Sequence, residues 1–382
     1  MSQKKNPRRI GITTGGGDCP GLNAVIRAVV LRATAVGIEV VGIEDGFGGL
    51  LSGTGMGVRV LTPAEVSPLL DRGGTILGTT NRGDPFAFPG PDGEPVDRSA
   101  ELISRARELG LELVITVGGD GTQRIAYRLD QLGLPVIGVP KTIDNDLAAT
   151  VETFGFGTAV QVVVDSLDRL RTTAESHDRT MLLEVMGRDA GWIALHAGIA
   201  GGADVILLPE LPYVPERVAE ALRRRVENGY SFALIVVAEG ASAVGESVAT
   251  KQVAGAIGGR QAPLLGGAAH RAASQIATLL PDHEYRVTVL GHVQRGGTPT
   301  AYDRLLASRL GVAAVDAALR GEHGVLVASF PPEIRTVPLA DAAQRVRRVD
   351  PTGQLVAHAR GLGIDFGDNP PSTGAGNTSE SR

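Results

Sequence analysis

The sequence predicts an α/β protein built from two doubly wound, Rossmann-like parallel-sheet domains. Short β-branched runs alternate along the chain with segments whose apolar residues recur at helical spacing, a pattern typical of parallel strands covered by helices on both faces. The length of 382 residues suffices for two such domains, because a domain takes roughly 150 residues. Glycine-rich loops also follow several predicted strands directly, as ligand-binding loops do in open α/β sheets.

The elements of the first half follow from this alternation. The run RIGITT predicts a strand, and the apolar stripe that follows, with spacings of three and one from Leu22 to Ala33, predicts a helix. The same reasoning, applied onward to residue 139, predicts further strands at 38–43, 113–117 and 135–139 and further helices at 99–109 and 122–132.

The second half continues the rhythm. We expect helices at 158–172, 191–200, 216–228 and 303–319, a glycine-interrupted helical stretch within 251–280, and strands at 181–185, 204–208, 232–238 and 286–290. The predicted domains comprise residues 1–155 with a return segment at 287–330, and residues 156–286. A C-terminal segment covers 331–366, and the tail 367–382 is expected to be disordered, because it has no aliphatic residue larger than Ala.

Composition excludes several classes of protein. The net charge of −5 argues against nucleic acid as the main partner. No apolar run approaches the roughly 18 residues that a membrane helix needs, and the basic N-terminus lacks the apolar segment of a signal peptide. The single cysteine, Cys19, fits a reducing compartment. We therefore expect a cytoplasmic protein without a membrane partner.

Three loops carry the residues most suited to chemistry. They have the sequences TGGGD at 14–18, GGDGT at 118–122 and PKTIDND at 140–146, each directly after a predicted strand. Glycine lets backbone N–H groups approach an anion closely, and a helix N-terminus, which Thr122 is suited to open, adds unpaired donors. These loops predict a phosphate site, with a tight strand-to-helix turn as the alternative for the first loop.

An acidic residue, Asp120, lies among the glycines of the second loop. It would repel a phosphate unless a cation lay between them, and Mg²⁺ prefers one or two carboxylates together with phosphate oxygens. Asp120 is therefore a candidate Mg²⁺ ligand. The alternative is that it caps the following helix.

Two carboxylates, Asp144 and Asp146, lie two residues apart in the third loop. Phosphoryl transfer to an alcohol needs a carboxylate that accepts the hydroxyl proton, with cations around the transferred group, so Asp144 is the candidate base. The alternative is an Asx-type turn in which both side chains bond local backbone. Arg188 and Arg295 each follow a later predicted strand, and arginine suits phosphate because its planar fork donates in pairs.

Taken together, these segments resemble the 6-phosphofructokinase family. The matching strings run in order from GITTGGGDCPGLNAVIR through VGGDGT, PKTIDND and EVMGRDAGW to GHVQRGGTPTAYDRLLASRLG, and they span about residues 9–314. The resemblance implies transfer of a phosphoryl group from Mg-ATP to D-fructose 6-phosphate, a step of glycolysis that yields fructose 1,6-bisphosphate and ADP. It implies a nucleotide-binding first domain, a sugar-phosphate-binding second domain, an active site in the cleft between them, and a homotetramer.

The resemblance also implies roles for individual residues. Asp144 corresponds to the base on the sugar 1-hydroxyl, Thr142 to a contact of the transferring group, and Arg188 to the arginine that stabilises its charge. Asp120 corresponds to the Mg²⁺-linked aspartate. The implied ATP contacts are Gly16, Arg82, Gly83, Gly118, Gly119, Asp120, Gly121 and Thr122. The implied sugar-phosphate contacts are Thr142, Ile143, Asp144, Met186, Gly187, Arg188, Glu239, His292, Val293, Gln294 and Arg295, together with Arg179 and Arg286 supplied across a subunit interface.

The donor signature is mixed. In this family a glycine after GGD and a glycine before TIDND resemble ATP-dependent forms, whereas Asp and Lys there resemble pyrophosphate-dependent forms; this chain has Gly121 and Lys141. We expect ATP, because an Asp at position 121 would repel a nucleotide phosphate and Gly does not. The alternatives are a pyrophosphate-dependent phosphotransferase, a kinase of another sugar phosphate, and a non-catalytic nucleotide- or sugar-phosphate-binding regulatory protein.

Overall fold

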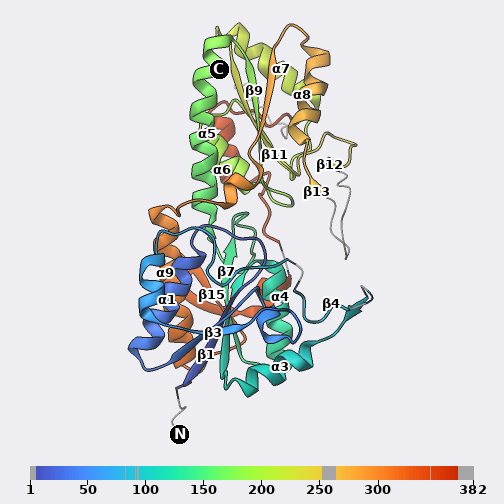
Figure 1. Ribbon diagram of the computed structural model, residues 1–382. Coiled ribbons are helices and arrows are strands. Elements are labelled where there is room, and N and C mark those ends of the chain that lie inside the picture. Colours follow the sequence, from blue (N-terminus) through green and yellow to red (C-terminus); the bar gives the residue numbers. More distant parts are fainter. Residues whose placement is uncertain are drawn as a thin grey trace, which may run out of the picture. The chain divides into compact units, whose positions relative to one another are not determined.

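The computed structural model describes residues 6–81, 83–90, 92, 94–251, 264–344 and 346–368. The chain divides into two compact units, each with its own sheet (Figure 1). Unit 1 comprises Met1–Val163, Gln252–Leu264 and Leu290–Arg348, and unit 2 comprises Val164–Lys251, Leu265–Val289 and Val349–Arg382. The predicted α/β class with predominantly parallel sheets is confirmed.

The sheet of unit 1 has the order β16-β15-β7-β6-β1-β2-β3, and β8 pairs with β7 beyond this path. All neighbours are parallel except the two outer pairs, β2–β3 and β15–β16, which are antiparallel. The strands are β1 (Arg9–Thr14), β2 (Glu39–Ile43), β3 (Val58–Leu61), β6 (Leu113–Gly118), β7 (Val136–Thr142), β8 (Phe154–Gly155), β15 (Val325–Phe330) and β16 (Glu333–Pro338).

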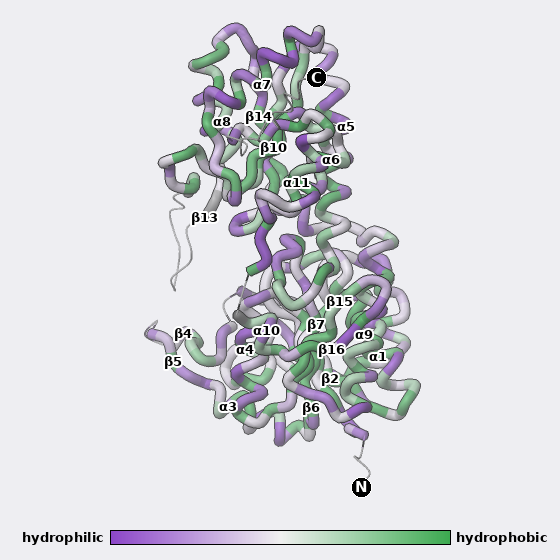
Figure 2. Tube along the Cα trace, turned by 180° about the vertical axis from the view of Figure 1, so that it is seen from behind, coloured by the Kyte–Doolittle hydropathy of each residue, from purple (hydrophilic) through white to green (hydrophobic). Residues whose placement is uncertain are grey.

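Helices cover both faces of this sheet. On one face α1 (Leu22–Ala35) packs against α9 (Ala301–Leu319) so closely that a Cβ on Gly311 would lie 2.9 Å from the Val25 carbonyl oxygen. On the other face lie α3 (Ser99–Glu108), α4 (Asp120–Gln131) and α10 (Leu339–Gln344), whose apolar residues join a core with the strands (Figure 1). Because helices cover both faces, β6 and β7 are buried almost throughout and mostly apolar, as the colouring of Figure 2 shows.

Unit 2 contains a smaller, fully parallel sheet of order β10-β11-β9-β14. Helices α7 and α8 share one apolar core with its strands, and α5 and α6 contact the strands of the same sheet (Figure 1). The strands are β9 (Thr180–Val185), β10 (Val205–Leu207), β11 (Ala233–Ala238) and β14 (Tyr285–Val289). The helices are α5 (Phe156–His177), which begins in unit 1, α6 (Trp192–Ala200), α7 (Pro215–Glu227), α8 (Ala268–Leu279) and α11 (Gln354–Gly361).

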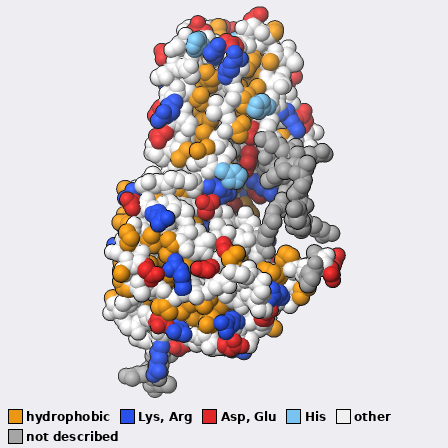
Figure 3. Space-filling model, viewed as in Figure 1, with side chains coloured by type: hydrophobic (Ala, Val, Ile, Leu, Met, Phe, Trp, Pro, Cys, Tyr) orange, Lys and Arg blue, Asp and Glu red, His pale blue; other side chains and the backbone are white. Residues whose placement is uncertain are grey.

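Shorter elements connect these. They are the helix α2 (Pro63–Val66), the 3₁₀ turns Gly48–Leu50, Ser67–Leu69 and Gly291–Arg295, and the two-residue strands β4 (Phe88–Pro89), β5 (Pro95–Val96), β12 (Thr250–Lys251) and β13 (Leu264–Leu265). Lys and Arg side chains are interspersed with Asp and Glu over the face drawn in Figure 3. None of the helices in the described ranges is long and apolar enough to span a bilayer.

The helical stretch expected within 251–280 is only partly correct. Ala268–Leu279 is helical, but Lys251 and Leu264–Leu265 are strand residues, and residues 252–263 lie outside the described part of the chain. Of the expected disordered tail, Gly367 and Asp368 are described: the Gly367 carbonyl accepts from the N–H of Val214 at 2.7 Å, and Asp368 pairs with Arg360 at 2.6 Å. Residues 369–382 are not described.

Candidate active site

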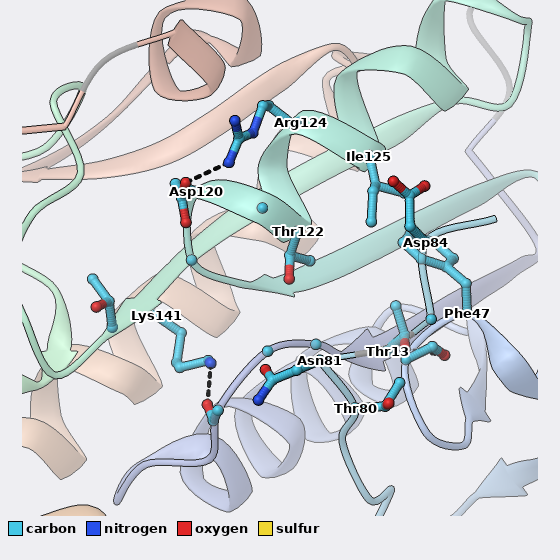
Figure 4. A pocket seen from close by; sticks show the side chains of 18 of the residues that line it. Thr13, Phe47, Thr80, Asn81, Asp84, Asp120, Thr122, Arg124, Ile125 and Lys141 are labelled. Carbon is cyan, nitrogen blue, oxygen red and sulfur yellow. Dashed lines mark hydrogen bonds and ion pairs between the residues drawn. The ribbon is translucent and has the colours of Figure 1, made fainter. Parts of the chain in front are cut away.

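A cavity of about 790 Å³ lies at the carboxyl ends of the parallel strands of unit 1 (Figure 4). Strand β1 pairs with β2 on one side and β6 on the other, so the strand order switches there, which is where open α/β sheets bind ligands. Residues from all three predicted loops line the cavity: Gly15, Gly16, Gly17, Gly119, Asp120, Gly121, Thr122, Lys141, Thr142, Asp144 and Asp146.

The first loop follows β1 and is held by hydrogen bonds to residues 79 and 80. The N–H of Gly16 donates to the Thr80 carbonyl at 3.1 Å, and the Thr79 hydroxyl donates to the Gly16 carbonyl at 2.5 Å. Gly16 has a φ of 79°, a left-handed conformation that favours glycine. The loop is therefore held in a backbone conformation that a residue other than glycine at position 16 would adopt only with strain.

The second loop leads from β6 into α4. Gly119 occupies the N-cap position and the helix begins at Asp120, so the expectation that Thr122 opens the helix is wrong. Asp120 does not cap the helix either; its Oδ2 instead accepts from Nη2 of Arg124 at 2.6 Å (Figure 4). Thr122 packs tightly against the loop: a Cβ added to Gly118 would lie 2.4 Å from the Cβ of Thr122.

The third loop begins within the last residues of β7. A buried cation there, Lys141, links it to the first loop. Lys141 is 3% exposed, and its ammonium donates to the Gly17 carbonyl. Burial lowers the pKa of this ammonium, while the nearby Cys19 and acidic groups oppose that shift. Cys19 is itself fully buried, and burial raises the pKa of its thiol to about 12.

The turn that carries the two carboxylates is held by other side chains. The Thr142 hydroxyl accepts from the N–H of Asp144 at 3.0 Å, and Oδ1 of Asn145 accepts from the N–H of Thr153 at 3.0 Å. Asn145 has a φ of 50°, a conformation that asparagine tolerates better than most residues. Asp144 and Asp146 are half-buried and line the same cavity as Asp120.

The cavity suits a cation that arrives with a phosphate ligand. Within the described residues, no group of three or more His, Cys, Asp or Glu side chains is arranged to hold a metal by itself. Asp120 supplies a carboxylate at a glycine-rich helix N-terminus. Mg²⁺ takes one or two carboxylates and completes its shell with phosphate and water oxygens, so these residues fit Mg²⁺ in complex with a nucleotide.

The remaining predicted residues of unit 1 differ in placement. Arg295 and Gly83 line the cavity. Gly118, Ile143 and Gln294 are buried, whereas His292 and Val293 are exposed on the 3₁₀ turn that carries Arg295. Arg82 lies outside the described residues.

In unit 2 the predicted residues Met186, Gly187, Arg188 and Glu239 meet at the carboxyl ends of β9 and β11. The N–H of Glu239 donates to Val185 O at 2.8 Å, and that of Gly240 donates to Gly187 O at 3.1 Å. The Arg188 side chain is 47% exposed, with its Nε 3.8 Å from Asp189. The structure thus brings Arg188 and Glu239 to one edge of the sheet.

Arg179 and Arg286 belong to the opposite end of the same sheet. Arg179 precedes β9, and Arg286 pairs with Met181 near its start. Both arginines bind one carboxylate: Nε of Arg179 lies 2.7 Å from Glu284, and Arg286 also contacts Glu284. Because β9 has six residues at about 3.3 Å each, roughly 20 Å of strand separates the end beside Arg179 from the end that leads to Arg188.

Sequence reasoning missed part of the cavity wall. Phe47, Asn81, Asp84, Arg124, Ile125, Tyr127 and Arg128 also line it (Figure 4). A helical spacing signal was present for Arg124, which follows Asp120 by four residues and therefore lies on the same face of α4. The loops that carry Phe47 and Asp84 have no comparable signal.

Comparison with known proteins identifies relatives over most of the chain. The Phosphofructokinase family model matches residues 9–318. An ATP-dependent 6-phosphofructokinase of Chloroflexus aurantiacus is 56% identical over 96% of this chain and 99% of its own length. A pyrophosphate–fructose 6-phosphate 1-phosphotransferase of Amycolatopsis methanolica is 49% identical over 90% of this chain and 96% of its own. The solved phosphofructokinase from Saccharomyces cerevisiae is 30% identical with a TM-score of 0.75, covering 88% of this chain and 45% of the yeast chain.

Proposed function

The chain belongs to the phosphofructokinase family, and on that premise we propose that it transfers the terminal phosphoryl group of ATP to the 1-hydroxyl of D-fructose 6-phosphate. The products are ADP and fructose 1,6-bisphosphate. The observation that carries this proposal is that Asp120 and Asp144, from two different loops, line one cavity. The carboxylate expected to hold the metal and the carboxylate expected to take the proton therefore face one ligand space.

The nucleotide phosphates are assigned to the glycine-rich first and second loops of unit 1. Gly16, Gly119, Gly121 and Thr122 line the cavity, and the N-terminus of α4 offers unpaired N–H donors to an anion. Asp120 would hold Mg²⁺ bound to those phosphates. When bound, Mg²⁺ neutralises charge on the transferring group.

In the transfer step the sugar 1-hydroxyl oxygen bonds to the terminal phosphorus while the bond from that phosphorus to the bridging oxygen breaks. Asp144 accepts the hydroxyl proton, and ADP leaves with the electrons of the broken bond. Thr142, next to Asp144 in the cavity wall, is assigned to the transferring group. Arg188 is assigned to the charge that develops on it.

On the family resemblance, the sugar phosphate is assigned to His292 and Arg295 and to Met186, Gly187 and Glu239. Arg179 and Arg286 are assigned to a neighbouring subunit's site in a homotetramer. Their location at the opposite end of β9 from Arg188 supports a role outside their own chain's site. A glycolytic enzyme of this kind would work in the cytoplasm.

The proposal of ATP as donor rests on the residues of the site, because a relative named for ATP and a relative named for pyrophosphate are each about half identical to this chain. One observation supports ATP, and a second shows that Lys141 does not oppose it. Nothing lies within 4 Å of where a Cβ on Gly121 would sit, which leaves room for a nucleotide phosphate there. Lys141 is buried, and its ammonium donates a hydrogen bond to the Gly17 carbonyl. The Lys141 charge therefore stabilises the contact between the two loops and is compatible with either donor.

A coupled assay with fructose 6-phosphate and each donor in turn tests the proposal. Turnover is expected with Mg-ATP and not with Mg-pyrophosphate. Turnover with pyrophosphate alone would establish the alternative donor. Absence of turnover with both donors, in protein that still binds nucleotide, would instead indicate a regulatory binding protein.

A further inference from the structure

The charged side chains that line the cavity balance one another. Of those in the described part of the chain, four are acidic and four are basic: Asp84, Asp120, Asp144, Asp146, Arg124, Arg128, Lys141 and Arg295. A nucleotide brings several negative charges, so its phosphates need basic groups that are able to turn toward them. The present partners of the four cations indicate which of them is able to do so.

Three of these cations have partners other than the expected metal ligand. Lys141 is buried and donates to the Gly17 carbonyl. Arg295 donates to the Asp18 carbonyl at 3.3 Å. The guanidinium of Arg128 lies 3.5 Å from the centre of the Phe86 ring.

Arg124 is different because its partner is the expected metal ligand. Its Nη2 lies 2.6 Å from Oδ2 of Asp120, one helical turn earlier, and its side chain is 59% exposed (Figure 4). Side chains on a helix lean toward its N-terminus, so the guanidinium lies over the first turn of α4, where N–H groups are available to phosphate.

We propose that Arg124 is a further phosphate-binding residue, which exchanges the Asp120 carboxylate for a phosphate oxygen of the nucleotide when Asp120 coordinates Mg²⁺. The inference rests on the proposed function. A guanidinium binds phosphate through paired N–H donors, and a carboxylate shared with a divalent cation has less charge to offer it. The alternative is an ordinary exposed i,i+4 ion pair, which contributes little to either stability or binding.

Calorimetric titration with the non-hydrolysable β,γ-imido analogue of ATP tests this without turnover. With Mg²⁺ present, Arg124→Gln is expected to raise the dissociation constant about tenfold, the loss typical of one charge-assisted hydrogen bond. With EDTA in place of Mg²⁺, the dissociation constants of the wild type and the variant should differ by less than about twofold, because Arg124 then stays paired with Asp120. Arg124→Lys retains a cation without the paired donors of a guanidinium. Its dissociation constant with Mg²⁺ should lie between those of the wild type and Arg124→Gln.

Arg105→Gln is the matched control. It breaks a comparable exposed helical pair, Arg105–Glu108 at 3.1 Å, on a helix that does not line the cavity, so its affinity should equal that of the wild type. Equal affinity of Arg124→Gln and wild type with Mg²⁺ would overturn the inference, as would an equal loss with and without Mg²⁺. If the wild type bound no nucleotide analogue at all, the proposed function would fail too, which a donor assay detects separately.

Discussion

At the scale of single residues, the side chains around the cavity divide into those that shape the loops and those that face the ligand space. Thr142 and Asn145 hold the turn of the third loop by accepting hydrogen bonds from backbone N–H groups, while Asp144 and Asp146 line the cavity. The sequence left open whether the two aspartates formed the turn. The sequence alone does not decide this, because aspartates are common both in turns and in ligand-binding sites. The contact of Asn145 with Thr153, eight residues later, becomes visible only in the folded structure.

Replacing the proposed base tests the chemistry directly. Asp144→Ser is expected to lower kcat about 10²–10⁴-fold or more, with little change in nucleotide binding, because a positioned general base contributes that much. Steady-state kinetics and calorimetric titration measure the two effects. Asp71→Ser, at an exposed position, is the control; near-normal turnover of Asp144→Ser would remove Asp144 from this role.

The open space beside Gly121 allows a clean test of donor choice. Gly121→Asp should fold normally, since no atom lies within 4 Å of the added Cβ, yet its carboxylate should repel the nucleotide phosphates. We expect KM for ATP to rise about tenfold or more. Gly121→Asn has the same size without the charge, so it separates repulsion from steric exclusion. Unchanged ATP kinetics in Gly121→Asp would contradict the argument.

At the scale of elements, two buried carboxylates hold helix N-termini from distant parts of the chain. Asp303 on α9 accepts from the N–H and hydroxyl of Thr158, in the first turn of α5, at 2.6 and 2.5 Å. Glu184 on β9 accepts from the N–H groups of Gly267 and Ala269 at the start of α8. Anionic groups at helix N-termini are stabilising, so the first contact fixes the start of α5 against α9, and the second fixes the start of α8 against β9.

The cap by Asp303 should depend on pH. Burial raises the pKa of this carboxyl above its ordinary value, so between about pH 4 and the raised pKa the folded state keeps a proton that the unfolded state has lost. Its contribution to stability is therefore largest below that window and declines as pH rises.

Denaturation of Asp303→Asn, whose side chain does not titrate, measures this dependence. We expect the variant to lose about 1–3 kcal/mol of unfolding free energy, and the difference from wild type to shrink between pH 4.5 and 8. Asp316→Asn, on the same helix and paired at the surface with Arg32, is the control. A difference that widens with increasing pH would contradict the prediction.

Most central strands could be predicted from the sequence, but β15, which is buried and paired on both sides, was missed together with two edge strands. The strands β1, β6 and β7 are buried over most of their length and are rich in Ile, Val or Leu, which gives a strong signal. Strand β3 has four residues, and β16 alternates between exposed and half-buried positions, so neither was anticipated. Edge strands are partly solvated, and their residues are therefore less constrained to a recognisable pattern.

For the chain as a whole, doubly wound topology brings loops that are far apart in sequence to one end of a sheet. Strands β1 and β6, adjacent in the sheet, are separated by about a hundred residues of sequence, and their carboxyl ends bring TGGGD and GGDGT together. Motif order therefore predicted which loops converge within unit 1. The wall formed by Phe47 and Asp84 was missed because only the three-dimensional arrangement brings those loops to the cavity.

Hybrid oligomers test whether Arg286 serves a neighbouring subunit. Co-expressed chains carrying Asp144→Ser and Arg286→Ser, each inactive alone, should regain activity when purified together by two tags, because one of two paired sites then carries neither lesion. Chains carrying Asp144→Ser and Arg188→Ser should stay inactive, since both residues are assigned to one chain's site. Activity in neither hybrid would place Arg286 in its own chain's site.

The burial of Cys19 has a practical consequence. Its thiol has no exposed surface and a pKa of about 12, so alkylating reagents, which attack the thiolate, should leave it untouched in the folded protein. The chain has no other cysteine. A cysteine introduced at any exposed position would thus be the sole reactive handle for a fluorophore or spin label, and distances could be followed in solution without removing the native sulfur.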